Sequence, residues 1–404
     1  MRPRNLARDS AIGNTMQLKR PHILLVERRE QAEFSLGSLL SGGAGVQCAD
    51  RWIALAPHLG VEVPLELEDL AVIDAVGDRQ GTMRAQLDLQ FGQARVQALV
   101  DAGLLIGDHA EHEALLARDR ALADAAWWPP AAVAQAFGRW RGVDVESAET
   151  RGSRPTLESM VEQHGPPPSE EFSVRPDRTW TQLPAPSTTA LDSLLASRAT
   201  CRNFDPAFCL PLASLSAMLH RVFGVQATLS LGSGAVVVKK NSPSGGGLHP
   251  VEAFLLVQRV EGVAIGLYHY QSIAHALEPM RLLEAGKAAD LARELVAGQS
   301  CFAQAPVLAL LAARFVRSNW KYRNHAKAWK VAQLDAGHLS QNLYLTATEM
   351  GLGAFVTAAM NDQCAERCFE LDGMAIGAVA VCGMGKRAEV LSNVELDPLG
   401  LSVR

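Results

Sequence analysis

Three absences exclude broad classes of protein. No uncharged apolar run reaches about 18 residues, the length that a membrane-spanning helix needs. The basic N-terminal stretch has no apolar core of the kind found in a secretory signal. The 7 cysteines form no C-x-x-C pair and no dense framework, which favours reduced thiols over disulfides. These absences predict a cytoplasmic protein with no membrane partner.

Positive charge is also scarce. The chain has 38 Lys and Arg against 43 Asp and Glu, a net charge of −5, which argues against general binding of nucleic acid by a basic surface. With 404 residues, of which 48% are hydrophobic, the chain is long enough for two or three domains with their own cores.

The N-terminal part has the pattern of a winged helix-turn-helix. Residues 1–20 are expected to be a disordered tail, and residues 21–110 a winged-helix-like module. Arg95 is the one cation on its last helix, so we expect the module to bind a peptide as an added strand rather than DNA. A purely structural domain remains an equal alternative. Two strands and three helices are expected, at His22–Arg28, Gly45–Pro57, Leu65–Val76, Met83–Phe91 and Gln93–Ala102.

Residues 111–186 are expected to be a helical segment followed by a linker. The alanine-rich part should be broken at Trp127-Trp128-Pro129-Pro130, because proline cannot continue a helix. Arg151–Ser187 contains seven of the 20 prolines, which is typical of a linker or an extended arm. The main domain boundary is therefore placed near Pro186, and residues 187–404 form the second domain.

A glycine-rich loop dominates the second domain. Gly245, Gly246 and Gly247 lie between Pro243 and Pro250 and are followed at once by a strand-like run, a pattern that suits a loop closely approached by a flat ligand. Two arginines lie about forty residues upstream, and the sequence GMGKR comes late in the chain. Together these features indicate a site for a phosphate-bearing cofactor.

The longest predicted helix is Ala332–Met350, whose small and apolar residues recur at steps of three and four and form one buried stripe. Gly337 lies beside that stripe and would allow another backbone to approach. His338 is interpreted as structural rather than catalytic. Cys364 and Cys368 lie four residues apart on a helix and are interpreted as buried thiols rather than metal ligands.

Six segments in order resemble one family. They are RATCRNF at 198–204, PSGGGLHPVE, GLYHYQ, KYR, DAGHLSQNLYLTATEMGLG and a final VCGMGK. Together, over Leu191–Arg387, they resemble the flavin-dependent nitroreductase-like proteins, and more narrowly the SagB-type azoline dehydrogenases that mature ribosomally made peptides. The resemblance implies an α+β, nitroreductase-like FMN fold with an antiparallel sheet and helices, and a homodimer. FMN is preferred over FAD because no G-x-G-x-x-G follows a strand.

The resemblance also implies the residues that hold FMN. A phosphate grip would come from the first arginine segment and from the late basic residues, and ring contacts from the glycine loop, the central helix and the segment after it. Forked guanidinium donors suit a phosphate dianion. The implied cofactor-binding residues are Arg198, Ala199, Thr200, Arg202, Pro243, Ser244, Gly245, Gly246, Gln341, Val356, Thr357, Ala358, Lys386 and Arg387.

Lys321 and Tyr322 are the expected catalytic pair, since azoline dehydrogenases carry a matching Lys-Tyr. They follow a strand-like run ending at Phe315, and an end-of-strand loop lets side chains face a cofactor. Lys321 would accept a Cα proton if its surroundings favour the neutral amine, and Tyr322 would relay the proton or hold the ring nitrogen. The implied partners are a peptide with a leader and a cyclase. A reductase using NAD(P)H and a non-catalytic peptide-binding scaffold stay open.

Overall fold

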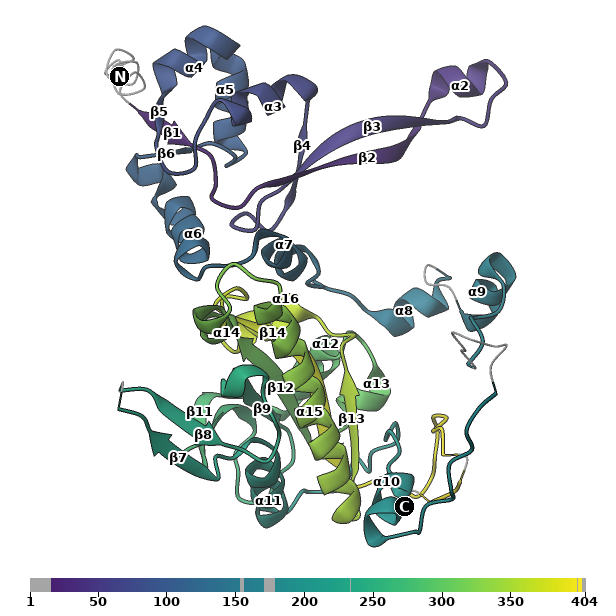
Figure 1. Ribbon diagram of the computed structural model, residues 1–404. Helices are drawn as coiled ribbons and strands as arrows, with labels where there is room; N and C mark the ends of the chain where they lie inside the picture. Colours follow the sequence, from purple (N-terminus) through teal and green to yellow (C-terminus); the bar gives the residue numbers. More distant parts are fainter. Residues whose placement is uncertain (1–15, 153–155, 171–178, 233, 398, 402–404) are drawn as a thin grey trace. The chain divides into compact units, whose positions relative to one another are not determined.

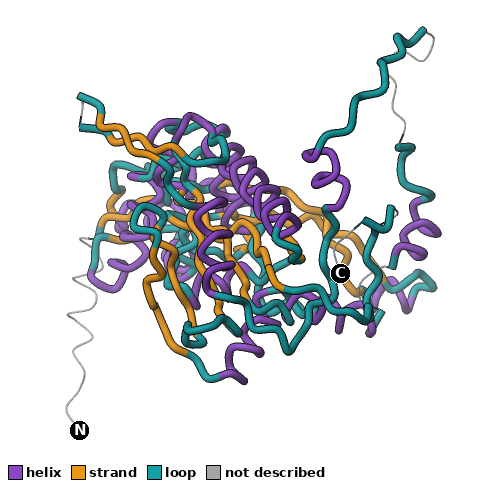
Figure 2. Tube along the Cα trace, turned by 90° about the horizontal axis from the view of Figure 1, so that it is seen from below, coloured by secondary structure: helices purple, strands orange, loops and turns teal. Residues whose placement is uncertain are grey.

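The computed structural model describes residues 16–152, 156–170, 179–232, 234–397 and 399–401 (Figure 1). Helices and strands are mixed along the whole trace, as the α+β class requires (Figure 2). The chain forms two compact units. The first comprises Met1–Arg139, Phe315–Lys330 and Gly373–Ile376, and the second comprises Trp140–Arg314, Val331–Asp372 and Gly377–Arg404. The first break in the chain between units thus lies well before Pro186.

The first unit has a core built on a small antiparallel sheet. In the sheet order β5-β1-β6, β1 (Gln17–Lys19) pairs with β5 (Thr82–Met83) and β6 (Ile106–Gly107). Leu18 is fully buried, so the expectation of a disordered tail to residue 20 is wrong for residues 16–20. Residues 1–15 lie outside the described part. The helices of this core are α3 (Leu67–Asp74), α4 (Arg84–Phe91) and α5 (Gln93–Asp101).

A long β-hairpin leaves this core. Strands β2 (Leu25–Phe34) and β3 (Val46–Leu55) pair over their full length, and β4 (Glu62–Leu65) pairs with the last four residues of β3. The short helix α2 (Leu36–Leu40) lies at the tip. The predicted strands and helices of the module are present, with β2 beginning three residues later than expected. The likeness to a winged helix stays a prediction.

Tryptophan and proline residues at 127–130 organise the end of the first unit. Helix α6 (Glu113–Asp124) stops before them, but Pro129 and Pro130 begin α7 (Pro129–Phe137), because the first turn of a helix needs no backbone donor. Trp127 is buried against Phe315, with ring centroids 5.0 Å apart. The indole Nε1 of Trp329 donates to Gln135 at 3.2 Å. These contacts explain why 315–330 belongs to this unit, including α14 (Phe315–Lys321).

The chain then enters the second unit through two short helices, α8 (Val145–Thr150) and α9 (Leu157–His164). Asn361 fixes the entry, since its side-chain amide bonds both the N–H and the C=O of Val143, at 2.8 and 2.9 Å. The expected linker Arg151–Ser187 contains one of these helices, α9. The rest of its described residues are exposed and irregular, and 171–178 lie outside the described part.

A six-stranded sheet forms the centre of the second unit, in the order β11-β10-β9-β12-β14-β13. Neighbours β11 and β10, β10 and β9, β9 and β12, and β14 and β13 are antiparallel. The predicted buried run of β12 is confirmed, with seven consecutive buried residues. The strands are β9 (Val251–Val257), β10 (Gly266–Gln271), β11 (Ala276–Leu282), β12 (Val307–Arg314), β13 (Gly353–Thr357) and β14 (Ile376–Gly385).

The predicted long helix is α15 (Lys327–Glu349), which runs beside this sheet (Figure 1). Its buried stripe is confirmed at Ala332, Ala336, Leu339, Leu343 and Ala347.

No helix among the described residues is long and apolar enough to cross a membrane. The remaining elements are α10 (Ala190–Ser197), α11 (Leu212–Phe223), the β7–β8 hairpin (Ala227–Ser230, Val236–Lys239), α12 (Ala285–Leu295), α13 (Ser300–Ala303) and α16 (Asp362–Cys368).

Candidate functional site

The first arginine segment lies between two distant parts of the chain. The N–H of Cys201 donates to Ala354 of β13 at 2.9 Å, and the N–H of Asp205 donates to Lys386 at 2.9 Å. Phe204 and Arg387 form a further antiparallel bridge. RATCRNF, GLGAFVTAA and GMGKR are therefore brought together, although about 180 residues separate the first from the last.

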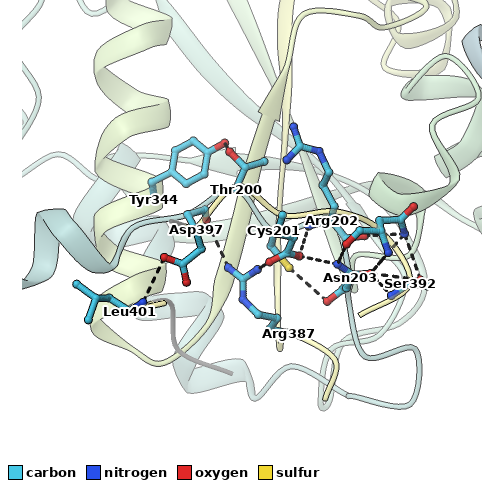
Figure 3. Close-up of polar contacts among 12 residues, drawn as sticks. Thr200, Cys201, Arg202, Asn203, Tyr344, Arg387, Ser392, Asp397 and Leu401 are labelled. Carbon is cyan, nitrogen blue, oxygen red and sulfur yellow. Dashed lines mark hydrogen bonds and ion pairs between the residues drawn. The ribbon is translucent and has the colours of Figure 1, made fainter. Parts of the chain in front are cut away.

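Tyr344 connects these segments to α15. Its hydroxyl contacts the hydroxyl of Thr200 (Figure 3), with 3.1 Å between the two oxygens, and it accepts a hydrogen bond from the N–H of Val356 at 3.1 Å. The guanidinium of Arg198 lies 5.2 Å from the centroid of the Tyr344 ring. Sequence reasoning did not single out this residue. The available signal was that it is one of only 4 tyrosines and lies in the longest matched motif.

Asp335, also on α15, holds the glycine loop. Its carboxylate accepts from the Ser244 hydroxyl at 2.5 Å and from the N–H of Gly245 at 3.0 Å. The Ser244 oxygen in turn accepts from the N–H of His249 at 2.8 Å. Two donors expected to bind the flavin ring are thus bonded within the chain. Asp335 is buried and was missed, because nothing in the sequence says which groups a helical carboxylate will meet.

Two different physical constraints explain why glycine occupies these three consecutive positions. A Cβ on Gly245 would lie 2.5 Å from the Cβ of Val331, so a side chain there would collide with α15. Gly246 and Gly247 have φ of 69° and 70°, a conformation that favours glycine. A Cβ on Gly247 would meet no atom within 4 Å, so that residue faces open space. The loop thus combines a tight side against α15 with an open, bare-backbone side.

The four cations expected at the phosphate differ in their partners. Arg198 and Arg202 form no salt bridge within the described residues, whereas Lys386 lies 3.5 Å from Asp205. Arg387 is buried in an ion pair with Glu395, whose carboxylate also accepts from the N–H of Arg202 at 2.6 Å. The two arginines of the first segment are therefore the better placed to bind an added anion.

Asn203 bonds a short C-terminal segment, residues 392–395, which also carries the ion-pair partner of Arg387. The side-chain oxygen of Asn203 accepts from the N–H groups of Ser392 and Asn393 at 2.8 and 2.7 Å (Figure 3). Its amide nitrogen donates to Glu395 at 2.9 Å. Arg387 thus stabilises the fold through this segment.

The other expected residues occupy varied positions. Lys321 is the last residue of α14, not part of a loop, since α14 follows β12 without a break. Its Nζ lies 5.8 Å from the Tyr322 ring centroid, and the lysine is exposed, so the burial on which its role as a base depended is not found in this chain. Both residues belong to the first unit.

Three further groups complete the expected set. Val356 and Thr357 end β13, and the Thr357 hydroxyl accepts from the N–H of Ala359 at 3.1 Å, closing the turn through Ala358. Gln341 is exposed on α15. The neighbouring Asn342 donates to Ser242 at 2.7 Å. No group of three or more His, Cys, Asp or Glu that could hold a metal occurs in the described part.

Replacing Arg387 with leucine should destabilise the protein strongly. The change leaves the carboxylate of Glu395 buried without its cation, which typically costs about 3–5 kcal/mol. Lys386→Ala is the matched control, since its side chain is 42% exposed and its pairing with Asp205 is worth at most about 1 kcal/mol. Chemical denaturation measures both. Equal, small losses for the two variants would contradict a structural role for Arg387.

Comparison with known proteins gives one consistent result. The Nitroreductase family profile matches residues 195–386. The nitroreductase-like protein MJ1384 of Methanocaldococcus jannaschii is 29% identical over 181 residues, 45% of this chain and 84% of that protein. The microcin B17-processing protein McbC of Escherichia coli is 31% identical over 149 residues, 36% of this chain and 53% of McbC.

A solved structure agrees with the fold. One chain of the Escherichia coli microcin synthetase McbBCD complex with truncated pro-MccB17 bound superposes with a TM-score of 0.50 at 23% identity, covering 66% of this chain and 98% of that chain. The expected nitroreductase-like fold of mixed helices and sheet is thereby confirmed. Residues 195–386 of the chain are thus similar to the Nitroreductase family and, within it, resemble the SagB-type peptide-maturing proteins through the likeness to McbC, a microcin B17-processing protein.

Proposed function

We propose that this protein is a SagB-type, FMN-dependent dehydrogenase that oxidises azoline rings, or a similar residue, in a ribosomally made peptide during its maturation. One observation carries the proposal. Two arginines without salt-bridge partners in the described chain lie in the segment that Tyr344 ties to α15, the helix that also holds the bare glycine loop. The similarity to McbC supports a peptide as the substrate.

The residues present fit an FMN phosphate. Arg198 and Arg202 supply forked, charged donors, and Thr200 supplies a hydroxyl. The open side of the loop at Gly247, where no atom would meet a Cβ, suits the edge of a flat ring. Because Ser244 and Gly245 are bonded to Asp335, we assign them to shaping the loop, and we assign the glycine backbone after them to facing the ligand.

The cofactor and the protein would perform different parts of the reaction. Bound FMN would accept the hydride, and the protein would orient the peptide and remove the proton. We assign proton removal from the peptide Cα to Lys321 or to Tyr322, adjacent residues at the end of α14. Because Lys321 is exposed in this chain, the bound peptide or a second subunit must supply the dry surroundings that favour a neutral amine.

We propose that the first unit recognises the leader of the precursor. Strand β2 pairs only with β3 among the described strands, so its other edge offers backbone donors and acceptors to an added strand. Arg95, the candidate base-reading cation, donates to Asp69 at 2.7 Å. Its charge is thus already balanced, which favours peptide over nucleic acid.

We further propose a homodimer that packs along α15. Leu334, Gly337, His338 and Gln341 are exposed at the spacing of one helical face.

A cyclase partner is proposed because McbC, a relative, processes microcin B17, and the similar solved chain belongs to a synthetase complex holding a pro-peptide. A cytoplasmic location is proposed because the described cysteines are free thiols.

An NAD(P)H-dependent reductase is the second candidate, favoured by the match to MJ1384, which covers 84% of that protein. Rapid bleaching of the flavin by NAD(P)H would support it. A scaffold without turnover would show no flavin reduction by either NAD(P)H or the peptide.

The wild-type protein should carry FMN non-covalently, and Arg198→Ala with Arg202→Ala should release it. Loss of two charge-assisted bonds should weaken binding roughly 100-fold or more. Lys386→Ala should weaken FMN binding less, because the ammonium group of Lys386 is already paired with Asp205. Flavin absorbance after gel filtration measures retention. A colourless wild type that FMN cannot reconstitute would exclude the proposal.

Lys321→Ala and Tyr322→Phe should keep FMN but lose peptide oxidation by about 10²–10⁴-fold, the usual contribution of a general base. Lys327→Ala is the matched control, as an exposed lysine six residues away. Conversion of the peptide is followed by mass spectrometry. Near wild-type rates for both variants would remove the chemical basis for azoline oxidation.

Shortening the β2–β3 hairpin should weaken recognition of the leader alone. Joining Glu30 to Asp50, which pair across the hairpin, through an Asn-Gly turn removes residues 31–49 and leaves the core of the first unit intact. We expect a higher KM for the full precursor and an unchanged KM for a leaderless core. Tight, salt-sensitive binding of the intact protein to duplex DNA would instead support a nucleic-acid role.

Gly337→Trp should convert the dimer to monomers without disturbing the fold. A Cβ at Gly337 meets no atom of its own chain within 4 Å, so only a partner would be displaced. Gly286→Trp on α12 is the control, since that helical glycine is equally open. Light scattering measures the mass. A monomeric wild type, or a dimer that tolerates Gly337→Trp, would contradict packing along α15.

A further inference from the structure

Two cysteines outside the proposed flavin site form a close pair. Cys364 and Cys368 lie four residues apart on α16, with their sulfur atoms 3.9 Å from each other. Cys364 is 2% exposed, whereas Cys368 is only partly buried. The structure therefore corrects the expectation that both thiols are buried, since one can be reached from solvent.

Cys368 opens into a pocket of about 500 Å³. The pocket is formed by the end of β11, the turn after it, α12 and Cys368 itself, all in the second unit. Its cations are Arg281 and Lys287, and its one acidic residue is Glu284. Three leucines complete the lining. A small polar oxidant or a thiol reagent can therefore reach the sulfur beside two positive charges.

The electrostatic surroundings favour a thiolate at Cys368. A hydrogen bond from the Cys364 thiol lowers the pKa of Cys368 first, and the Arg281 guanidinium lowers it further, while partial burial opposes both. The pKa of Cys364 is raised by the same pairing. The charged groups around the pair are Arg281, Glu284, Lys287, Glu294 and Arg367.

Three of the other five thiols differ. Burial raises the pKa of Cys201, Cys301 and Cys382, and Cys382 is fully buried. Thiolate character combined with access, the condition for a reactive cysteine, is thus met at Cys368.

The Cα spacing of the pair suits a disulfide. Residues i and i+4 of an α-helix have Cα atoms about 6 Å apart, inside the range of about 4.4–6.8 Å seen for disulfides. Cys368 is the last residue of α16, so closing the sulfur distance disturbs only the end of a seven-residue helix.

We propose that Cys368 is a peroxide-reactive thiol and that Cys364 resolves it into a reversible disulfide. The Cys368 thiolate attacks one peroxide oxygen, the O–O bond breaks, and sulfenic acid and hydroxide form. The Cys364 sulfur then attacks the sulfenic sulfur, the S–S bond forms and water leaves. Peroxide is reduced by two electrons and the thiols are oxidised by two, and an external dithiol reverses the change.

Treatment of the full-length protein with hydrogen peroxide tests this directly. Remaining thiols are alkylated and the protein is digested with trypsin, which cuts after Arg367, between the two cysteines. We expect the peptides 331–367 and 368–386 to be joined by a disulfide that dithiothreitol removes, with Cys382, the other cysteine of the second peptide, found alkylated. Cys301→Ser, the control at another partly buried thiol, should still form it.

Two variants separate the steps. Cys364→Ser should accumulate sulfenic acid at Cys368, trapped by a 1,3-diketone, whereas the wild type should show little. Arg281→Gln should slow alkylation of Cys368 at pH 7 about tenfold, as its pKa returns toward that of a free thiol near 8.5. Circular dichroism confirms that each variant is folded. Oxidation of exposed Cys48 or Cys209 before Cys368, or absence of the linked peptides, would overturn the proposal whatever reaction the flavin site performs.

Discussion

The buried carboxylate of Asp335 is the interaction on which the proposed site depends. It holds both the side chain and the backbone at the start of the glycine loop, and a buried charge is stable only when such donors satisfy it. Tyr344, nine residues later on α15, ties the first arginine segment to β13. One helix therefore fixes the relative positions of the loop and of the arginines, so a cofactor can meet both without reorganising them.

Charge is distributed unequally around these arginines. Arg387 is committed to Glu395 inside the fold, and Lys386 shares its charge with Asp205. Arg198 and Arg202 keep their forked donors for another group, at least within the described chain. Asn203 holds the segment that carries Glu395, so the residue directly after Arg202 also contributes to stability.

Local pattern was enough to predict the regular elements of the second unit. The predicted long helix Ala332–Met350 is present as α15, because residues that recur at steps of three and four set its buried stripe locally. The predicted break at Trp127-Trp128-Pro129-Pro130 is confirmed between α6 and α7, and the same prolines also begin α7. The burial of Trp127 against Phe315 could not be predicted, because it depends on a residue far away in the sequence.

The sequence motifs of the site could be predicted, but the contacts that their residues make could not. Family order pointed to the glycines and arginines, yet it could not show that Ser244 and Gly245 already bond Asp335, or that Arg387 pairs with Glu395. Each of these partners lies far away in the sequence or outside the motifs. The same reason hid the pocket at Cys368, whose cations come from β11 and α12.

The central claim is that this scaffold directs electrons from a peptide to a flavin. Anaerobic mixing of the purified, flavin-loaded protein with a precursor that carries azoline rings, followed by the flavin absorbance, tests it most directly. The account predicts that the peptide alone bleaches the flavin and gains azole rings in equal amount. Bleaching by NAD(P)H but not by the peptide would contradict it.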